Sequence, residues 1–147
     1  MLIFAPGAWF MFLGQETCNE ERITMRKIEI NAGGATARAT LLDNATADGI
    51  WQVLPVTARA NRWGDEFYFE IPAHLPQADD AREVVEPGEL GYWPVGHAFC
   101  IFWGPTPVSH GDEPRAYSPV NVFGRLEGDP GIFDAVPGGT KIKVERV

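Results

Sequence analysis

The chain has 147 residues, 45% of them hydrophobic, which allows one domain with a substantial core but not two domains of ordinary size. Its 20 acidic side chains outnumber its 12 basic ones, which gives a net charge of −8. Because such a surface repels phosphate groups, neither nucleic acid nor an anionic membrane is expected as a partner. The two cysteines, Cys18 and Cys100, make no disulfide framework, and this usage predicts a cytoplasmic protein.

Residues 1–24 are interpreted as an N-terminal extension and residues 25–147 as the domain. The apolar run over residues 2–13 is too short to span a bilayer, and no basic residue precedes it as one does in a secretory signal. A signal peptide is the alternative interpretation. If the extension is ordered, its apolar side chains must pack on something, so a homodimer formed through this segment is a further hypothesis.

Alternation of apolar and polar residues predicts strands over residues 25–31 and 35–42, joined by a Gly-Gly turn. The apolar spacing then becomes helical over residues 47–54, with Asn44 or Thr46 as the N-terminal cap. A proline directly after this segment ends the predicted helix, because proline cannot donate the backbone hydrogen bond that a further turn requires.

Residues 66–71 have the clearest strand pattern in the chain. Apolar and polar side chains alternate along it, with Phe67, Phe69 and Ile71 on one face and Glu66, Tyr68 and Glu70 on the other. One polar face is typical of an antiparallel sheet that meets solvent on one side. This face is interpreted either as exposed to solvent or as one wall of a ligand groove. Its two carboxyl groups are about 13 Å apart along the strand, too far to share a proton.

The rest of the chain consists of short apolar runs separated by Gly- and Pro-rich turns. Residues 92–103 predict a strand buried on both sides, in which Cys100 is a small apolar side chain. Residues 72–91 are polar and acidic, either a solvated loop or a docking site for a basic partner. Further predicted elements are strands over 56–60, 120–126 and 141–147, a loop over 104–119, and a helical turn or short strand over 132–136. This succession predicts an all-β barrel or sandwich.

Several short motifs carry a family resemblance. The run Val122-Phe123-Gly124-Arg125 is similar to a late strand of the cyclophilins, and residues 67–72 (FYFEIP) lie where cyclophilins have their catalytic strand. Residues 63–66 (WGDE), 88–93 (GELGYW) and 102–107 (FWGPTP) resemble, more closely, a prokaryotic family of cyclophilin-like proteins of unassigned function. The resemblance covers residues 25–147 and implies a closed β-barrel of about eight strands with one or two short helices.

The resemblance also identifies prolyl isomerisation as the activity to consider if the protein is an enzyme. In cyclophilins an arginine on the catalytic strand hydrogen-bonds the prolyl amide and weakens the double-bond character behind a rotation barrier of about 18–20 kcal/mol. The equivalent position here is Glu70, a group of opposite charge. The glutamine-phenylalanine-phenylalanine run of cyclophilins has no match after Gly104-Pro105. The resemblance therefore implies the fold without efficient isomerase activity.

The candidate residues for a ligand groove are Arg62, Tyr68, Glu70, His97, Phe102 and Phe123. Arg62 is close enough in sequence to neutralise Glu66, or it offers a planar fork to a ligand carboxylate. His97 is either a structural histidine or a ligand-binding one. The large aromatic side chains near Gly/Pro loops are either core residues or the lining of a shallow apolar pocket: Trp63, Tyr92, Trp93 and Trp103.

The sequence predicts neither a cofactor nor a metal site, because its three histidines have no metal-ligand spacing. The leading hypothesis is a binding module for a small molecule or an extended peptide. The two alternatives are a prolyl isomerase that uses the same groove, and a structural subunit that works through the N-terminal extension and the acidic loop.

Overall fold

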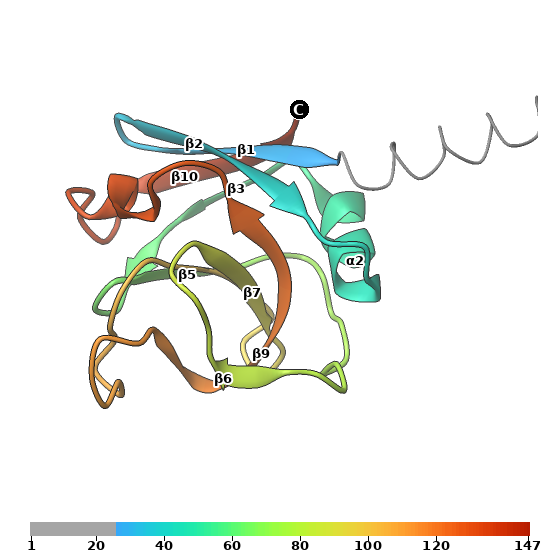
Figure 1. Ribbon diagram of the computed structural model, residues 1–147. Helices are drawn as coiled ribbons and strands as arrows, with labels where there is room; N and C mark the ends of the chain where they lie inside the picture. Colours follow the sequence, from blue (N-terminus) through green and yellow to red (C-terminus); the bar gives the residue numbers. More distant parts are fainter. Residues whose placement is uncertain (1–25) are drawn as a thin grey trace, which may run out of the picture.

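The computed structural model describes residues 26–147, which form a strongly curved antiparallel sheet with one helix against it (Figure 1). The predicted N-terminal extension, the homodimer hypothesis based on it, and Cys18 lie outside the described residues. The elements in chain order are β1 Lys27–Ala32, β2 Ala35–Leu41, α2 Ala45–Val53, β3 Val56–Arg59, β4 Asn61–Arg62, β5 Glu66–Glu70, β6 Arg82–Val84, β7 Glu89–Trp93, β8 Ala98–Phe102, β9 Arg115–Leu126, the 3₁₀ helix η1 Pro130–Phe133, and β10 Lys141–Arg146.

The sheet contains ten strands, and nine of them follow the order β3-β10-β1-β2-β9-β7-β8-β5-β4, while β6 pairs with β9. The all-β prediction is confirmed, but the closed barrel of about eight strands is wrong. The two end strands, β3 and β4, are separated in the chain by Ala60 alone, so they follow one another instead of pairing. Their hydrogen bonds go to different neighbours, β3 to β10 and β4 to β5, and the ladder stays open between them.

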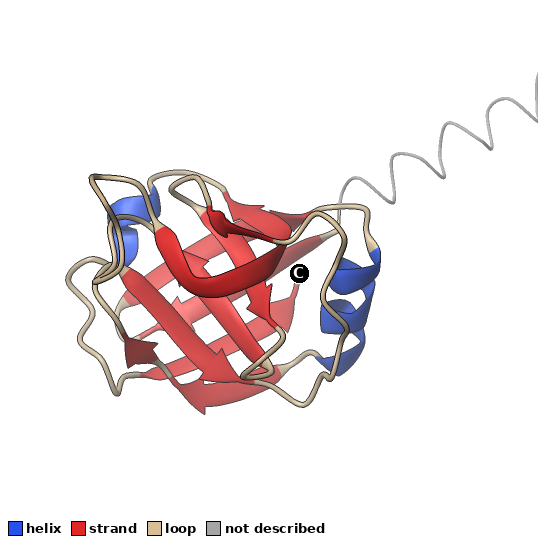
Figure 2. Ribbon diagram, turned by 90° about the horizontal axis from the view of Figure 1, so that it is seen from below, coloured by secondary structure: helices blue, strands red, loops and turns tan. Residues whose placement is uncertain are grey.

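The two helices lie at opposite ends of the curved sheet (Figure 2). The α2 helix is capped by Asn44, whose side chain accepts a hydrogen bond from the backbone N–H of Ala47 at 2.9 Å. Of the two predicted caps, Asn44 is therefore the one that the structure uses. Thr46 is buried and instead accepts a hydrogen bond from Asn121 on β9, which fastens the helix to the sheet.

Both faces of β8 are buried, as the sequence predicted, because apolar clusters lie on the two sides of the sheet. The larger cluster fills the inside of the curved sheet and includes Phe99, Ile101 and Phe123. The smaller cluster lies on the opposite face of β8, where β6 crosses over to pair with β9 (the β6 crossover). It consists of Val85, Ala98, Cys100, Phe102, Ala116 and Val120. Tyr68, Trp93 and Val122 pack against it from its edge.

The structure corrects three predicted elements. The run over residues 92–103 is a hairpin of β7 and β8 instead of one strand, because residues 94–97 form a turn in which Val95 is 71% exposed. The β9 strand begins at Arg115, inside the predicted loop, where β6 pairs with it. The predicted loop over residues 72–91 contains β6 and the first residues of β7. Of the two alternatives predicted over residues 132–136, the helical turn is the closer one, because residues 130–133, capped by Asp129, form a 3₁₀ helix.

Candidate functional site

A cavity of about 270 Å³ opens on the face of the sheet that carries the smaller apolar cluster. We call it the aromatic cavity, and its lining residues are Trp63, Glu66, Tyr68, Trp93, Cys100, Ala116, Tyr117 and Val120. They come from the β4–β5 turn, from β5, β7, β8 and β9, so five separate segments of the chain meet around one space.

Four aromatic rings stand around this cavity, each roughly perpendicular to its neighbour. Tyr117 lies 6.2 Å from Trp63 at an interplanar angle of 70°, and 6.2 Å from Trp93 at 83°. Trp93 in turn lies 6.5 Å from Tyr68 at 79°. Edge-to-face packing of this kind is favourable between aromatic rings.

Glu66 is the one acidic side chain that lines the aromatic cavity, and it is only 5% exposed. Its Oε1 atom is buried and has no hydrogen-bond partner among the described residues. Burial raises the pKa of this carboxyl group from 4.5 to about 8, because the ionised form loses hydration, while the neighbouring Cys100 thiol lowers the pKa in part. A buried polar atom without a partner is costly, and groups with strongly shifted pKa values concentrate at functional sites.

The alternation of β5 explains how Glu66 reaches this position. Glu66 pairs with Phe102, and Tyr68 pairs with Cys100, so these four side chains share the face of the sheet that carries the smaller apolar cluster. The sequence predicted this face correctly, but its interpretation as exposed to solvent is wrong for Glu66. The reason is the β6 crossover and the start of β9, which the sequence did not reveal and which cover that face.

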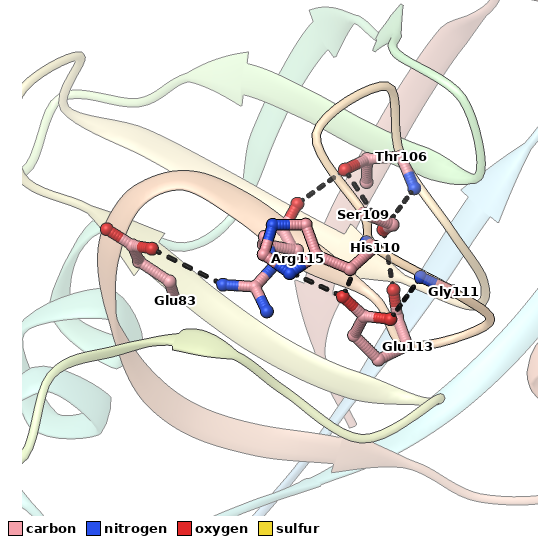
Figure 3. A network of polar contacts seen from close by, with 7 residues as sticks. All are labelled: Glu83, Thr106, Ser109, His110, Gly111, Glu113 and Arg115. Atoms are coloured by element: carbon pink, nitrogen blue, oxygen red, sulfur yellow. Dashed lines mark hydrogen bonds and ion pairs between the residues drawn. The ribbon is translucent and has the colours of Figure 1, made fainter.

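The loop between β8 and β9 is held by a polar network (Figure 3). The Glu113 carboxyl accepts hydrogen bonds from the backbone N–H groups of His110 and Gly111 and from Arg115, which also pairs with Glu83. These contacts, led by the His110 N–H, lower the pKa of Glu113 to about 2. The network fixes the first residue of β9, immediately before the lining residues Ala116 and Tyr117.

Two glycines let strands and rings approach closely at the cavity. A Cβ atom on Gly91 would lie 2.8 Å from Val120, so the backbone of β7 can pass directly beside β9 only without a side chain there. A Cβ atom on Gly96 would lie 2.5 Å from the Trp93 ring, which therefore packs closely against the turn after β7. The Trp93 ring is also held by a hydrogen bond from its Nε1 to Ser118.

The predicted groove residues do not meet in one cavity, although Tyr68 lines the aromatic cavity. Glu70 is exposed further along β5. His97 lies in the turn before β8, where its ring stacks on His74 at 4.0 Å. Phe102 and Phe123 are fully buried, in the smaller and the larger apolar cluster respectively.

In the described part of the chain, Arg62 makes contacts that hold the fold together and does not pair with Glu66. Its guanidinium donates to the backbone oxygens of Gly64, Asp134 and Val136, pairs with Asp65 and Asp134, and lies 5.2 Å from the centre of the Trp103 ring. These contacts fasten the β4–β5 turn to the segment after η1.

Of the eight residues that line the aromatic cavity, only Tyr68 had been selected as a groove candidate from the sequence. The residues not selected include Glu66, Trp93 and Tyr117. The signals for Glu66 and Trp93 were present, in the polar face of the strand and in the aromatic residues near Gly/Pro loops. Tyr117 gave no signal, because it lies in a Pro-rich stretch that resembles a loop and is 71% exposed even in the folded protein.

Comparison with known proteins identifies the family to which this fold belongs. The sequence matches the cyclophilin-like family over residues 26–145. The chain belongs to the cyclophilin-like family. This cyclophilin-like chain is also similar to the solution structure of the hypothetical protein AF2241 from Archaeoglobus fulgidus, with 33% sequence identity and a TM-score of 0.73 over 86% of this chain and 98% of the archaeal one. A comparison with curated proteins gave no match. No helix within residues 26–147 is long and apolar enough to cross a membrane.

Proposed function

We propose that this cyclophilin-like protein is a cytoplasmic small-molecule binding module, and that its ligand occupies the aromatic cavity. One observation carries the proposal: the buried carboxyl group of Glu66, whose Oε1 has no hydrogen-bond partner among the described residues, faces a space walled by four aromatic rings. A mostly apolar hollow with a single polar group is the usual composition of a ligand site, in which the polar group orients the ligand.

The size of the aromatic cavity favours a small molecule over an extended peptide. Its volume is about 270 Å³, at the lower edge of the roughly 300–1,000 Å³ that hold drug-sized ligands. A peptide that lies along a groove needs a row of pockets for alternate side chains. The candidates for such a row, Glu70, Phe102 and Phe123, are respectively exposed and buried in two different clusters.

Prolyl isomerisation has less support. Its mechanism requires a hydrogen-bond donor of fixed position that is aimed at the prolyl amide. Glu70, at the place of the cyclophilin arginine, is an exposed acceptor, and Arg62, the nearest arginine in sequence before β5, is engaged with backbone oxygens. A catalytic role for the same cavity is therefore not part of the proposal.

The test is a ligand screen of the full-length protein by NMR. The indole N–H signals of Trp63 and Trp93 serve as reporters, because both rings line the aromatic cavity. The library holds compounds of metabolite size in three equal groups: cationic, anionic and uncharged. We expect some members to shift both indole signals at millimolar or lower concentration. If no member shifts them, the proposed function is wrong.

Two variants show whether binding occurs in the aromatic cavity. Tyr117→Ala removes an exposed wall of the cavity, and Leu42→Ala is the matched control, because Leu42 is an exposed apolar residue outside it. We expect Tyr117→Ala to weaken binding of the screening hits at least fivefold and Leu42→Ala to leave it unchanged. Equal affinities in the two variants would place the binding elsewhere and contradict the proposal.

A further inference from the structure

We propose that the ligand is a small organic cation, either a protonated amine or a quaternary ammonium compound. Its positive group lies between the aromatic rings and the Glu66 carboxylate. This inference rests on the proposed function of the aromatic cavity and names the chemical class of its ligand. Two features support it: an acid that no neighbouring basic side chain pairs with, and aromatic rings that carry no cation.

The first feature is the missing counter-charge of Glu66. Among the residues that line the aromatic cavity none is basic. The two arginines next to the cavity in sequence are already engaged: Arg62 with Asp65 and Asp134, and Arg115 with Glu113 and Glu83. A buried carboxylate requires a paired positive charge. Since the surrounding described residues do not supply it, the ligand is its natural source.

The second feature is the set of aromatic rings. A cation within about 6 Å of the centre of a tryptophan or tyrosine ring is attracted by the electron-rich face, and rings grouped around one space recognise quaternary ammonium groups in this way. Elsewhere in the chain tryptophan faces are already used for cations: Trp51 contacts Arg26 and Arg146, and Trp103 contacts Arg62.

The two tryptophans of the aromatic cavity differ from these. Within residues 26–147 neither Trp63 nor Trp93 has an arginine or lysine over its ring. Both rings are only partly buried, and both are held in place by aromatic neighbours. The cavity therefore combines tryptophan rings that carry no cation with an acid that has no counter-charge, a pair of features that matches an ammonium group better than a neutral or anionic one.

The state of Glu66 sets the pH dependence of such binding. The titratable groups around it are Tyr68 on its own strand, Cys100 on β8 and Tyr117 on β9. In the empty cavity the raised pKa of Glu66, about 8, keeps the carboxyl group mostly protonated at neutral pH. A cation stabilises the ionised form, so binding releases one proton: Glu66–COOH plus cation gives Glu66–COO⁻ with the cation beside it, and H⁺ in solution.

The experiment compares two probes of nearly equal shape by calorimetry with the full-length protein. Choline carries a permanent positive charge, and 3,3-dimethylbutan-1-ol is its uncharged carbon isostere. We expect choline to bind at least tenfold more tightly than the alcohol at pH 9. We also expect the choline affinity to rise at least tenfold between pH 6 and pH 9, with proton release detected as a dependence of the heat on the buffer.

Variants of the same strand supply the controls. Glu66→Gln keeps the shape of the side chain and removes its charge, so it should abolish the preference for choline and the pH dependence while still binding the alcohol. Glu70→Gln removes an exposed carboxyl group on the same face of β5 and should change neither.

The outcomes separate this inference from the proposed function. If the alcohol binds as tightly as choline at pH 9, or if choline binding weakens as the pH rises, the cation inference is wrong. A weakening would mean that the protonated Glu66 carboxyl donates a hydrogen bond to the ligand. If neither probe binds but members of the screening library do, the inference fails and the proposed function stands. If nothing binds, both fail.

Discussion

The Glu66 carboxyl and the Cys100 thiol face the same buried space from neighbouring strands, and burial raises the pKa of both groups. Ionisation of Glu66 raises the pKa of Cys100 further, because two negative charges would lie close together in a buried region. Neither group therefore ionises readily at neutral pH without a ligand beside it. A ligand that brings a positive charge changes this balance at Glu66 first.

The first prediction concerns stability against pH. The pKa of Glu66 is about 8 in the folded protein and near 4.5 without burial, so between these values the folded protein holds a proton that the unfolded chain has released. The contribution of Glu66 to stability is complete below pH 4.5 and is lost as the pH rises to 8. We expect the free energy of unfolding to decrease by up to about 1.4 kcal/mol per pH unit in this window.

Urea unfolding at half-unit pH steps, for the wild type and Glu66→Gln, measures this contribution. The variant has no titrating group at this position, so its curve should lack the decrease and lie above that of the wild type at pH 8. All other titratable groups are common to both proteins and cancel in the difference. A constant difference between the two curves from pH 5 to pH 8 would contradict the raised pKa.

The second prediction assigns Arg62 to structure. It joins the β4–β5 turn to the segment after η1 through three backbone oxygens and the Trp103 ring. Arg62→Ala should reduce the free energy of unfolding by about 2–4 kcal/mol, and Arg62→Lys should restore less than half, because a single ammonium group cannot reach all these acceptors. Arg59→Ala is the control, since Arg59 is exposed and donates only to Gly139 O in the described part of the chain; it should cost less than about 1 kcal/mol.

Urea midpoints and slopes of the four proteins test this assignment, together with the affinity of the screening hits. If Arg62→Lys lowers ligand affinity but leaves stability unchanged, Arg62 belongs to the binding site, as the sequence had suggested, and its structural role is secondary.

Local patterns predicted most of the fold, since strands such as β1, β2 and β5 and the helix α2 show their period and their caps directly in the sequence. The β7–β8 hairpin was missed because Val95 and His97 continue the alternating pattern of the strand through a turn. His97 also adopts a positive φ of 51°, which the residue type does not predict. The site was harder to predict. Glu66 looks like any polar residue on a strand, and only the crossover of β6 onto β9, a contact between distant segments, shows that its face is covered.

The third prediction tests the wall formed by Trp93. In Gly96→Ala the new methyl group would lie 2.5 Å from the ring, so the ring must move, whereas the backbone conformation of residue 96 is open to alanine. We expect the indole signal of Trp93 to shift and the affinity of the screening hits to decrease at least fivefold. Gly34→Ala is the matched control, because nothing lies within 4 Å of its added Cβ. An unchanged affinity in Gly96→Ala would mean that Trp93 does not contact the ligand.

The last prediction concerns catalysis. The full-length protein should not accelerate prolyl isomerisation of a model peptide in a protease-free assay, with a cyclophilin as the positive control. The physical reason is that rotation about the amide is eased by a donor fixed against the substrate, and the exposed Glu70 carboxylate is an acceptor. Glu70→Arg should also stay inactive, because an exposed arginine on β5 has no enclosed amide site around it. A rate above twice the uncatalysed one, abolished by Tyr117→Ala but not by Leu42→Ala, would contradict this prediction and make the aromatic cavity an active site. The hydrogen-bond donor to the prolyl amide would then be the protonated carboxyl group of Glu66 instead of an arginine.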